Sequence, residues 1–297
     1  MFRNVLVGVD DEGGRDALAL AQMLLAGDGE LTLAHVFRDE PPGPYRSDRK
    51  RADAGDQASA LLKQAASEAG VHAHIRWHGA TSVGRGLHEI AEMVDADLLV
   101  VGSSRRGLLG RAALGHDTRA ALNGAPCAIA IAPVGYGTEP PPLMREVGVG
   151  YDGSPESEHA LEVARAIATE RGSKLSACQA VSIPAYAYMG ALERVEVESI
   201  NRLVAKARDR IAAREGVEPH AVYGDTVEEL TLYSASLDLL VVGSRGYGPL
   251  GRLVHGSTAQ HLAGTARCPL LVLTRSARTA SEPAASDGRE RAAPTVA

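Results

Sequence analysis

The second half of the chain alternates short apolar runs with segments whose apolar residues recur at helical spacing. The run LLVV contains no polar residue, which is typical of a strand covered on both faces. Such a strand belongs to a sheet between two layers of helices. The strands predicted in this half are Glu146–Tyr151, Leu175–Val181, Pro219–Tyr223, Leu239–Val242 and Pro269–Leu273.

Two of the segments between these runs carry helix signals. One begins with Ser154 as the N-cap and Pro155 at the first helical position, and it ends at Gly172. In the other, apolar residues stand 3, 4, 7 and 11 positions after Ile200, which places them on one face of a helix. Five strands that alternate with helices predict a doubly wound α/β domain.

The same pattern occurs twice in the chain. NVLVGVD from Asn4 matches EVGVGYD from Glu146, and DLLVVGSS from Asp97 matches DLLVVGSR from Asp238. The copies are offset by 142 residues at the first pair (4 to 146) and by 141 at the second (97 to 238). A period of this length indicates a duplicated domain. We therefore predict an α/β fold of two doubly wound domains, each with a five-stranded parallel sheet.

Proline and glycine mark the boundary between the copies. The segment PVGYGTEPPPLM continues neither a helix nor a central strand, so we predict a linker at residues 134–142. The two domains then span residues 1–133 and 143–275. Residues 276–297 are rich in Ala, Ser, Arg and Glu and contain few large apolar side chains, which predicts a disordered tail.

Composition and charge narrow the class of protein. The net charge is −6 and only 4% of the 297 residues are aromatic, which does not favour nucleic-acid binding. No apolar run approaches the length of about 18 residues that a membrane span needs, and no signal segment precedes the first strand, so we expect a cytoplasmic protein. Cys127, Cys178 and Cys268 lack the C-x-x-C spacing, and we expect buried reduced thiols.

A glycine-rich stretch after the fourth strand of the second copy predicts a phosphate site. Its frame is Gly243-x-x-Gly246, nine residues, then Gly256-Ser257-Thr258. Gly243 ends the strand, and Gly246 lets the loop approach an anion closely. The Gly256 segment opens the next helix, whose free N–H groups and positive end favour phosphate. The simpler alternative is a mobile loop with an N-cap at Ser257.

The stretch also contains Gly246-x-Gly248-x-x-Gly251, formally a dinucleotide fingerprint. That interpretation is weak, because the fingerprint belongs after the first strand of a domain and needs an acidic residue about 20 positions further on. Here it follows the fourth strand, and no acidic residue lies between Gly251 and Arg275.

Asp152 ends the first strand of the second copy. If strands one and four are neighbours, Asp152 and Gly243 both lie where strand order reverses, which is where open α/β sheets bind ligands. A carboxylate there can accept hydrogen bonds from ribose hydroxyls or hold a phosphate-bound Mg²⁺. The alternative is an Asx-turn that leads into the helix capped by Ser154, and the two roles can coexist.

Each half resembles a universal stress protein domain, and the whole chain resembles the tandem-domain members of that family. The most specific element is the Gly-x2-Gly-x9-Gly-Ser/Thr spacing, which marks the ATP-binding branch. The resemblance implies the strand order 3-2-1-4-5 and a bound adenine nucleotide, often with a divalent ion such as Mg²⁺. It also implies roles for single residues: Asp152 and Gly243 at the ribose, Ala180 beside the adenine, and Gly246, Gly256, Ser257 and Thr258 at the phosphates.

The first copy departs from this frame at the anion-facing positions. It reads Gly102-x-x-Arg105, nine residues, then Gly115-His116-Asp117. Arg105 replaces the second glycine, and it either occludes the pocket or becomes a phosphate ligand itself. Asp117 at a helix start opposes a bound phosphate by like charge. We predict a degenerate first site, in which Asp10, Gly102 and Gly115 remain from the nucleotide-binding set.

A regulatory module that binds ATP in stress response is the function that these observations favour. Catalysis has little support, because the chain has no Gly-x-Ser-x-Gly elbow and no paired carboxylates beside the glycine loop. The alternative is a slow ATPase or nucleotidyl-transfer enzyme of related architecture, with His255 approaching a γ-phosphate. A third hypothesis is a partner-binding protein that has lost its ligand, against which the intact second frame argues.

The final strands of the two copies are apolar and carry no charge. They are CAIAIA (Cys127–Ala132) and PLLVLT (Pro269–Thr274). In the implied order the fifth strand is a sheet edge, and an apolar edge without a blunting charge pairs readily with another strand. We therefore predict that the two copies pair within one chain, with a homodimer as a further option.

Overall fold

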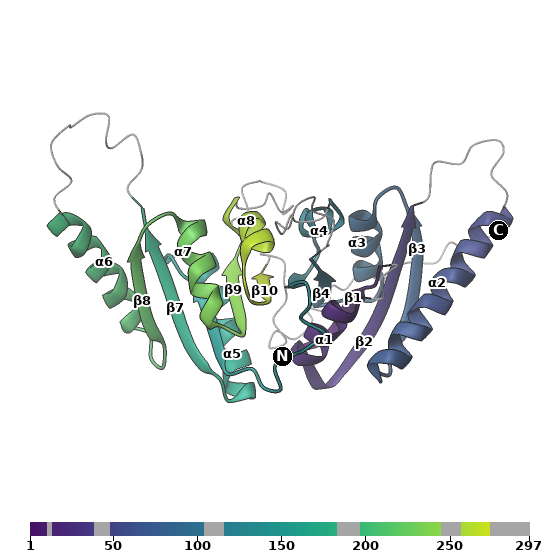
Figure 1. Ribbon diagram of the computed structural model, residues 1–297, viewed down its shortest axis with the longest axis horizontal. Coiled ribbons are helices and arrows are strands. Elements are labelled where there is room, and N and C mark those ends of the chain that lie inside the picture. Colours follow the sequence, from purple (N-terminus) through teal and green to yellow (C-terminus); the bar gives the residue numbers. More distant parts are fainter. Residues whose placement is uncertain (11–13, 39–47, 104–115, 183–196, 245–256, 274–297) are drawn as a thin grey trace, which may run out of the picture.

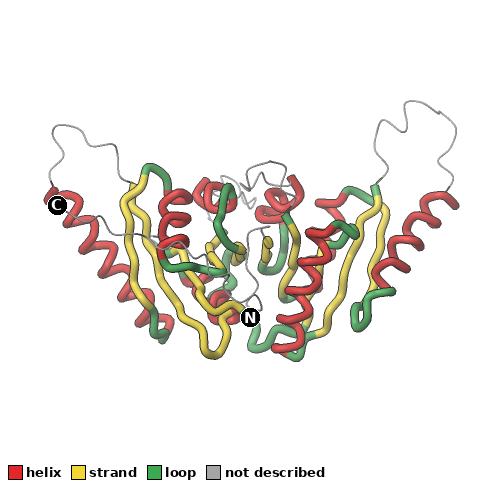
Figure 2. The backbone as a smooth tube through the Cα atoms, turned by 180° about the vertical axis from the view of Figure 1, so that it is seen from behind, coloured by secondary structure: helices red, strands yellow, loops and turns green. Residues whose placement is uncertain are grey.

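The computed structural model describes residues 1–10, 14–38, 48–103, 116–182, 197–244 and 257–273. Within these residues the strands form one ten-stranded sheet, with helices on both of its faces (Figures 1 and 2). The strand order is β3-β2-β1-β4-β5-β10-β9-β6-β7-β8. Each half therefore has the order 3-2-1-4-5, and the predicted fold class of two doubly wound α/β repeats is confirmed.

The two halves contain the same succession of elements, apart from a short 3-10 helix at Ser234–Ser236 in the second. In the first half these are β1 (Phe2–Gly8), α1 (Arg15–Leu24), β2 (Leu25–Arg38), α2 (Asp48–Ala69), β3 (His74–Ala80), α3 (Val83–Met93), β4 (Leu98–Gly102), α4 (His116–Leu122) and β5 (Ala128–Ala132). In the second half they are β6 (Glu146–Gly150), α5 (Pro155–Arg171), β7 (Lys174–Val181), α6 (Val197–Ala212), β8 (Glu218–Tyr223), α7 (Thr226–Tyr233), β9 (Leu239–Gly243), α8 (Ser257–Thr265) and β10 (Leu270–Leu273).

Helix α5 has the ends that the sequence predicts. Ser154 is the N-cap, and its hydroxyl accepts a hydrogen bond from the Ser157 N–H at 3.3 Å. The helix stops where Gly172 adopts a left-handed conformation with φ 68°, which costs glycine little because it has no Cβ. The Ser154 cap fixes the start of α5 close to the end of β6, beside the C-terminal edge of the sheet.

An aspartate directly before β4 and its counterpart before β9 bond to the first strand of their half. The Asp97 carboxylate accepts hydrogen bonds from the N–H groups of Arg3 and Asn4 at 2.7 and 3.0 Å. The Asp238 carboxylate likewise accepts from Arg145 and Glu146, at 2.6 and 2.9 Å. The repeated DLLVVGS sequence thus has a structural role at its aspartate.

Two hydrophobic clusters cover the two faces of the sheet. One cluster joins α1, α2, α5 and α6 and contains both Leu20 and Ile167. The other joins α3, α4, α7 and α8 and contains both Leu87 and Leu230. Each cluster therefore includes residues of both halves, so the apolar core continues from one half into the other.

The halves meet along the final strand of each repeat. Strand β10 pairs antiparallel with β5, with Leu270 opposite Ile131 and Val272 opposite Ile129. These are the two strands that the sequence predicts to pair. Arg171 at the end of α5 adds a second contact, because its guanidinium donates to the Met23 carbonyl at 2.6 Å, in the last turn of α1.

The segment predicted as a linker lies against α1. The N–H groups of Gly135 and Gly137 donate to the Asp16 carboxylate at 2.8 and 2.7 Å, and Tyr136 packs against the first cluster. Because the core runs through both halves, packing does not divide the chain at residues 133 and 143, and the predicted domain boundaries stay a prediction. The predicted tail at 276–297 lies outside the described residues.

Two further expectations concern the class of protein. Among the described helices, none is both long and apolar enough to cross a membrane. The thiols of Cys127, Cys178 and Cys268 are free and buried, as expected, and burial raises the pKa of each to about 12. A thiol with such a pKa carries almost no thiolate near neutral pH, so these cysteines are not nucleophiles.

Candidate functional site

The candidate site lies where β6 and β9 end side by side. The two strands pair in parallel, with Gly150 opposite Val242. Counting on two residues, Asp152 stands level with Ser244 at the C-terminal edge of the sheet. From β9 the strand order continues towards β10 and from β6 towards β7, so this is the point where strand order reverses. The first and fourth strands of this half are therefore neighbours, as the predicted ligand site at Asp152 requires.

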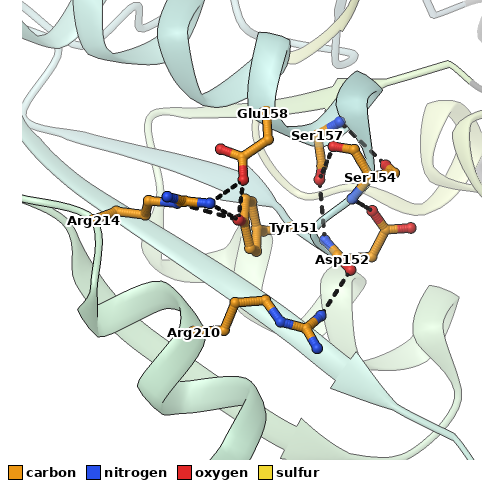
Figure 3. A network of polar contacts seen from close by, with 7 residues as sticks. All are labelled: Tyr151, Asp152, Ser154, Ser157, Glu158, Arg210 and Arg214. Atoms are coloured by element: carbon orange, nitrogen blue, oxygen red, sulfur yellow. Dashed lines mark hydrogen bonds and ion pairs between the residues drawn. The ribbon is translucent and has the colours of Figure 1, made fainter.

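Asp152 forms the turn between β6 and α5 (Figure 3). Its Oδ1 accepts a hydrogen bond from the Ser154 N–H at 2.9 Å, and its own N–H donates to the Ser157 hydroxyl at 3.3 Å. Gly153 has φ 80°, a conformation that side-chain-bearing residues rarely adopt. The Asx-turn expected as the alternative role of Asp152 is thus present, and it fixes the direction of the carboxylate.

Two arginines, Arg210 of α6 and Arg214 in the turn after it, brace this turn (Figure 3). Arg210 donates to the Asp152 carbonyl at 3.0 Å. Arg214 donates to the Tyr151 hydroxyl at 3.2 Å and forms an ion pair with Glu158. Sequence reasoning missed both arginines, because they lie 58 and 63 residues further along the chain than their partners and belong to no motif.

Tyr151 connects these groups to the core. Its hydroxyl donates to Glu158 at 2.5 Å, while its ring lies in the cluster on the α5 and α6 face. Burial and the hydrogen bond to Glu158 raise the pKa of Tyr151, so the phenol stays protonated near neutral pH. The pKa of Arg214 is also raised, mainly by its bond to the Tyr151 hydroxyl. Tyr151 therefore enters the network as a neutral hydroxyl that donates to Glu158 and accepts from Arg214.

Gly243 has a packing role that the motif does not disclose. A Cβ at this position would lie 2.5 Å from the Glu156 carbonyl oxygen, in the first turn of α5. Glycine is required there because the helix passes so close to the end of β9. A Cβ at Gly102, the matching position of the first half, would meet no atom of the described residues within 4 Å.

The phosphate end of the predicted site is only partly within the described residues. Helix α8 begins at Ser257, as the frame predicts, and Thr258 is partly buried in its first turn. Gly246 and Gly256, together with the candidate base His255, lie outside the described residues. In the first half the same holds for Arg105 and Gly115.

Ala180 lies on the neighbouring strand, at the height of Asp152. Because Gly150 is opposite Cys178, Asp152 and Ala180 follow at the same level, and Ala180 is half-buried. Sequence reasoning missed Ser244, whose side chain is only 3% exposed. Within the described part of the chain, its hydroxyl has no hydrogen-bond partner.

In the first half Asp10 follows β1 and is exposed, and Gly102 ends β4. The Gly102 carbonyl accepts a hydrogen bond from the Thr118 hydroxyl of α4 at 3.0 Å. A strand end bonded to a helix in this way has less backbone to offer a ligand. This closure is consistent with the degenerate first site that the sequence predicts, and that prediction stays open.

Two cavities, of about 530 and 330 Å³, lie elsewhere in the molecule. They are lined by the C-terminal turns of α1 and α5 and by the start of β7, at the opposite end of the sheet from Asp152. Neither is lined by a residue of the candidate site. We therefore place the candidate site by its residues and not by these cavities.

Comparison with known proteins agrees with the fold. The model of the universal stress protein family matches residues 1–133 and 144–274. A universal stress protein of Mycobacterium tuberculosis is 31% identical over 288 residues, which cover 92% of this chain and 97% of the relative.

A solved structure gives the same picture of the fold. A universal stress protein from Archaeoglobus fulgidus covers 92% of this chain and 98% of its own, with a TM-score of 0.63 at 17% identity, a similarity that concerns the fold alone. Another universal stress protein, solved in complex with cAMP, covers 36% of this chain and 81% of its own, with a TM-score of 0.29 at 26% identity.

Proposed function

Because the chain belongs to the universal stress protein family, we propose that it is a regulatory module that binds ATP in its second half, in the context of stress response. One juxtaposition carries the proposal. Asp152 at the end of β6 stands level with the residue after Gly243 at the end of β9, and α8 begins at the Ser257 of the predicted phosphate frame. The described parts of the frame thus meet at one edge of the sheet, where α/β folds bind ligands.

Each end of the nucleotide has a place in this proposal. The phosphates lie against Gly246, Gly256 and the free N–H groups at the start of α8, where Ser257 and Thr258 add hydroxyl donors. At the other end, Asp152 accepts hydrogen bonds from the ribose, and Ala180 borders the adenine. The Asx-turn supports this role of Asp152, because it orients the carboxylate before any ligand arrives.

Mg²⁺ fits the same arrangement only together with the phosphates. Among the described residues, no group of three His, Cys, Asp or Glu side chains forms a metal site by itself. Mg²⁺ commonly takes one or two carboxylates and completes its shell with substrate phosphates and water. We therefore propose that Asp152 contributes to an ion that enters with ATP and leaves with it.

A slow ATPase or nucleotidyl-transfer enzyme remains the alternative function. Hydrolysis needs a positioned base and a charge clamp on the γ-phosphate. Arg210 and Arg214 do not supply that clamp in the present geometry, because they bond to the backbone of Asp152 and to Tyr151 and Glu158. The regulatory module is therefore the preferred function, and cytoplasmic location and homodimer formation stay predictions.

The proposal is tested on the purified full chain. Mass spectrometry of the denatured protein is expected to detect co-purifying adenine nucleotide, and a phosphate-release assay is expected to give turnover far below about 1 per second, the low end of typical enzymes. Failure of ATP, with and without Mg²⁺, to bind to the nucleotide-free protein would contradict the proposal. Rapid phosphate release that disappears in His255→Ala would support the ATPase instead.

A further inference from the structure

We propose that the Ser244 hydroxyl is a further ligand-binding group of the second site and donates a hydrogen bond to a phosphate oxygen of the bound nucleotide. This inference rests on the proposed ATP binding and assigns a role to a residue at a position that the glycine frame leaves unspecified. The Ser244 hydroxyl is energetically unusual. Ser244 is 3% exposed, and within the described residues its Oγ meets no hydrogen-bond partner.

A buried hydroxyl without a partner destabilises the folded chain, because it loses its hydrogen bonds to water and gains none in return. The backbone of Ser244 is well placed, since its N–H donates to the Leu273 carbonyl at 3.0 Å and continues the ladder between β9 and β10. The side chain alone is unsatisfied. A ligand that supplies the missing acceptor accounts for a serine at a position where alanine would fit the apolar surroundings.

The pleat of β9 directs this hydroxyl towards α8. Leu240 and Val242 belong to the cluster on the α7 and α8 face, whereas Leu239 and Val241 belong to the other cluster. Side chains alternate along a strand, so Ser244 shares the face of Val242. Helix α8 covers that face through Leu262 and presents its N-terminus, the positive end of the helix, near the same edge. An anionic oxygen held there is the acceptor that the hydroxyl lacks.

Three other buried polar atoms share the lack of a partner but not the position. They belong to Tyr136, Arg171 and Gln179. Tyr136 lies in the segment between the halves, and Arg171 lies at the far end of α5. Gln179 is opposite Tyr151, one residue before the level of Asp152, and alternation places it on the α5 and α6 face. Among the residues that the structure describes, only Ser244 combines an unsatisfied group with the α8 face at the height of Asp152.

Ser244→Ala separates a ligand contact from a structural role. We expect the variant without nucleotide to melt about 1–3 °C higher than the wild type, because an unsatisfied group has been removed. We expect its affinity for ATP to fall about tenfold, the loss of one hydrogen bond to a charged group. Binding of adenosine, which has no phosphate, is expected to stay unchanged. Ser103→Ala, the matching change at the end of β4, is the control and is expected to leave ATP affinity as it is.

The outcomes separate this inference from the proposed function. If the wild type binds ATP and Ser244→Ala binds it equally well, Ser244 is not a ligand and the proposed function stands. A similar loss for adenosine and ATP would overturn the assignment to the phosphates. If the wild type binds no ATP, both proposals fail together. Because Ser244→Ala removes one buried atom, its melting curve without ligand also shows that a weaker affinity does not come from a damaged fold.

Discussion

The ends of β4 and β9 carry the same two residues, glycine and serine, in different surroundings. In the first half the Thr118 hydroxyl of α4 donates to the Gly102 carbonyl at 3.0 Å, so the helix is bonded to the strand end. At the same offset of 141 residues the second half has Ala259, which has no hydroxyl. Ser244 is buried there, and its hydroxyl has no hydrogen-bond partner among the described residues. The end of β4 is thus bonded to α4, whereas the end of β9 carries the buried hydroxyl that we propose to bind a ligand.

The turns after β1 and β6 differ in the same sense. Helix α5 begins with a side-chain cap from Ser154, and Arg210 holds the Asp152 carbonyl in place. Helix α1 begins at a left-handed Gly14 without a side-chain cap. The turn at Asp152 is therefore held by side-chain contacts, and we expect these contacts to preorganise its carboxylate for the proposed ribose contact. The features that the halves share, such as the hydrogen bonds that the Asp97 and Asp238 carboxylates accept from backbone N–H groups, stabilise the sheet.

The largest effect is expected from making the second half resemble the first. Gly246→Arg copies the residue found at Arg105 and places a bulky cation where the backbone has to approach phosphate. ATP affinity is expected to fall at least about 100-fold, or about 2.8 kcal/mol, with a melting temperature within about 2 °C of the wild type. Isothermal titration calorimetry measures the first and thermal melting the second.

Arg105→Gly is the matched control for this substitution. It changes the corresponding position of the first half and is expected to leave the affinity of the second site unchanged. Equal ATP affinity in Gly246→Arg and the wild type would remove Gly246 from the phosphate site.

Disruption of the pairing between β5 and β10 is expected to give the next largest effect. In Ile131→Pro the ladder between β5 and its neighbours loses an N–H donor, and the buried isoleucine is lost as well, at a cost of about 2–4 kcal/mol. We expect a melting temperature roughly 5–10 °C lower and a larger radius of gyration in solution scattering. Ile131→Val keeps the donor and controls for side-chain size. A proline variant with the melting temperature and radius of gyration of the wild type would show that the β5–β10 pairing does not hold the halves together in solution.

A smaller effect is expected from the carboxylate at the end of β6. Asp152→Asn keeps an oxygen for the Ser154 N–H but removes the charge, so the turn is expected to survive. Affinity for Mg²⁺-ATP is expected to fall about tenfold, because hydrogen bonds and metal contacts to a charged group are lost. Asp10→Asn, its counterpart in the first half, is expected to change nothing. Equal losses in the two variants would contradict the difference between the halves.

The sequence predicts the sheet well because the relevant forces are local. Apolar runs, the cap at Ser154 and the glycine at Gly172 each act within a few residues, and the duplicated pattern supplies every element twice. The fold class and the strand order follow from these signals together with the family resemblance. The bounds of the predicted strands agree with the structure within about one residue.

The candidate site is harder to predict because its supporting contacts are distant in sequence. Nothing in the neighbourhood of Arg210 indicates that it bonds to Asp152, and the close approach of Glu156 to Gly243 depends on how α5 packs on the sheet. The unsatisfied hydroxyl of Ser244 becomes visible only when the burial of the strand end is known. A motif identifies positions that contact a ligand, whereas tertiary packing decides which of them are free to do so.

The central claim is that the second half alone holds the nucleotide site. Calorimetric titration of the nucleotide-free full chain with Mg²⁺-ATP tests it most directly, because the stoichiometry counts the sites. We predict one site per chain, lost in Gly246→Arg and retained in Arg105→Gly. Two equivalent sites per chain, or one site that survives Gly246→Arg, would contradict the claim.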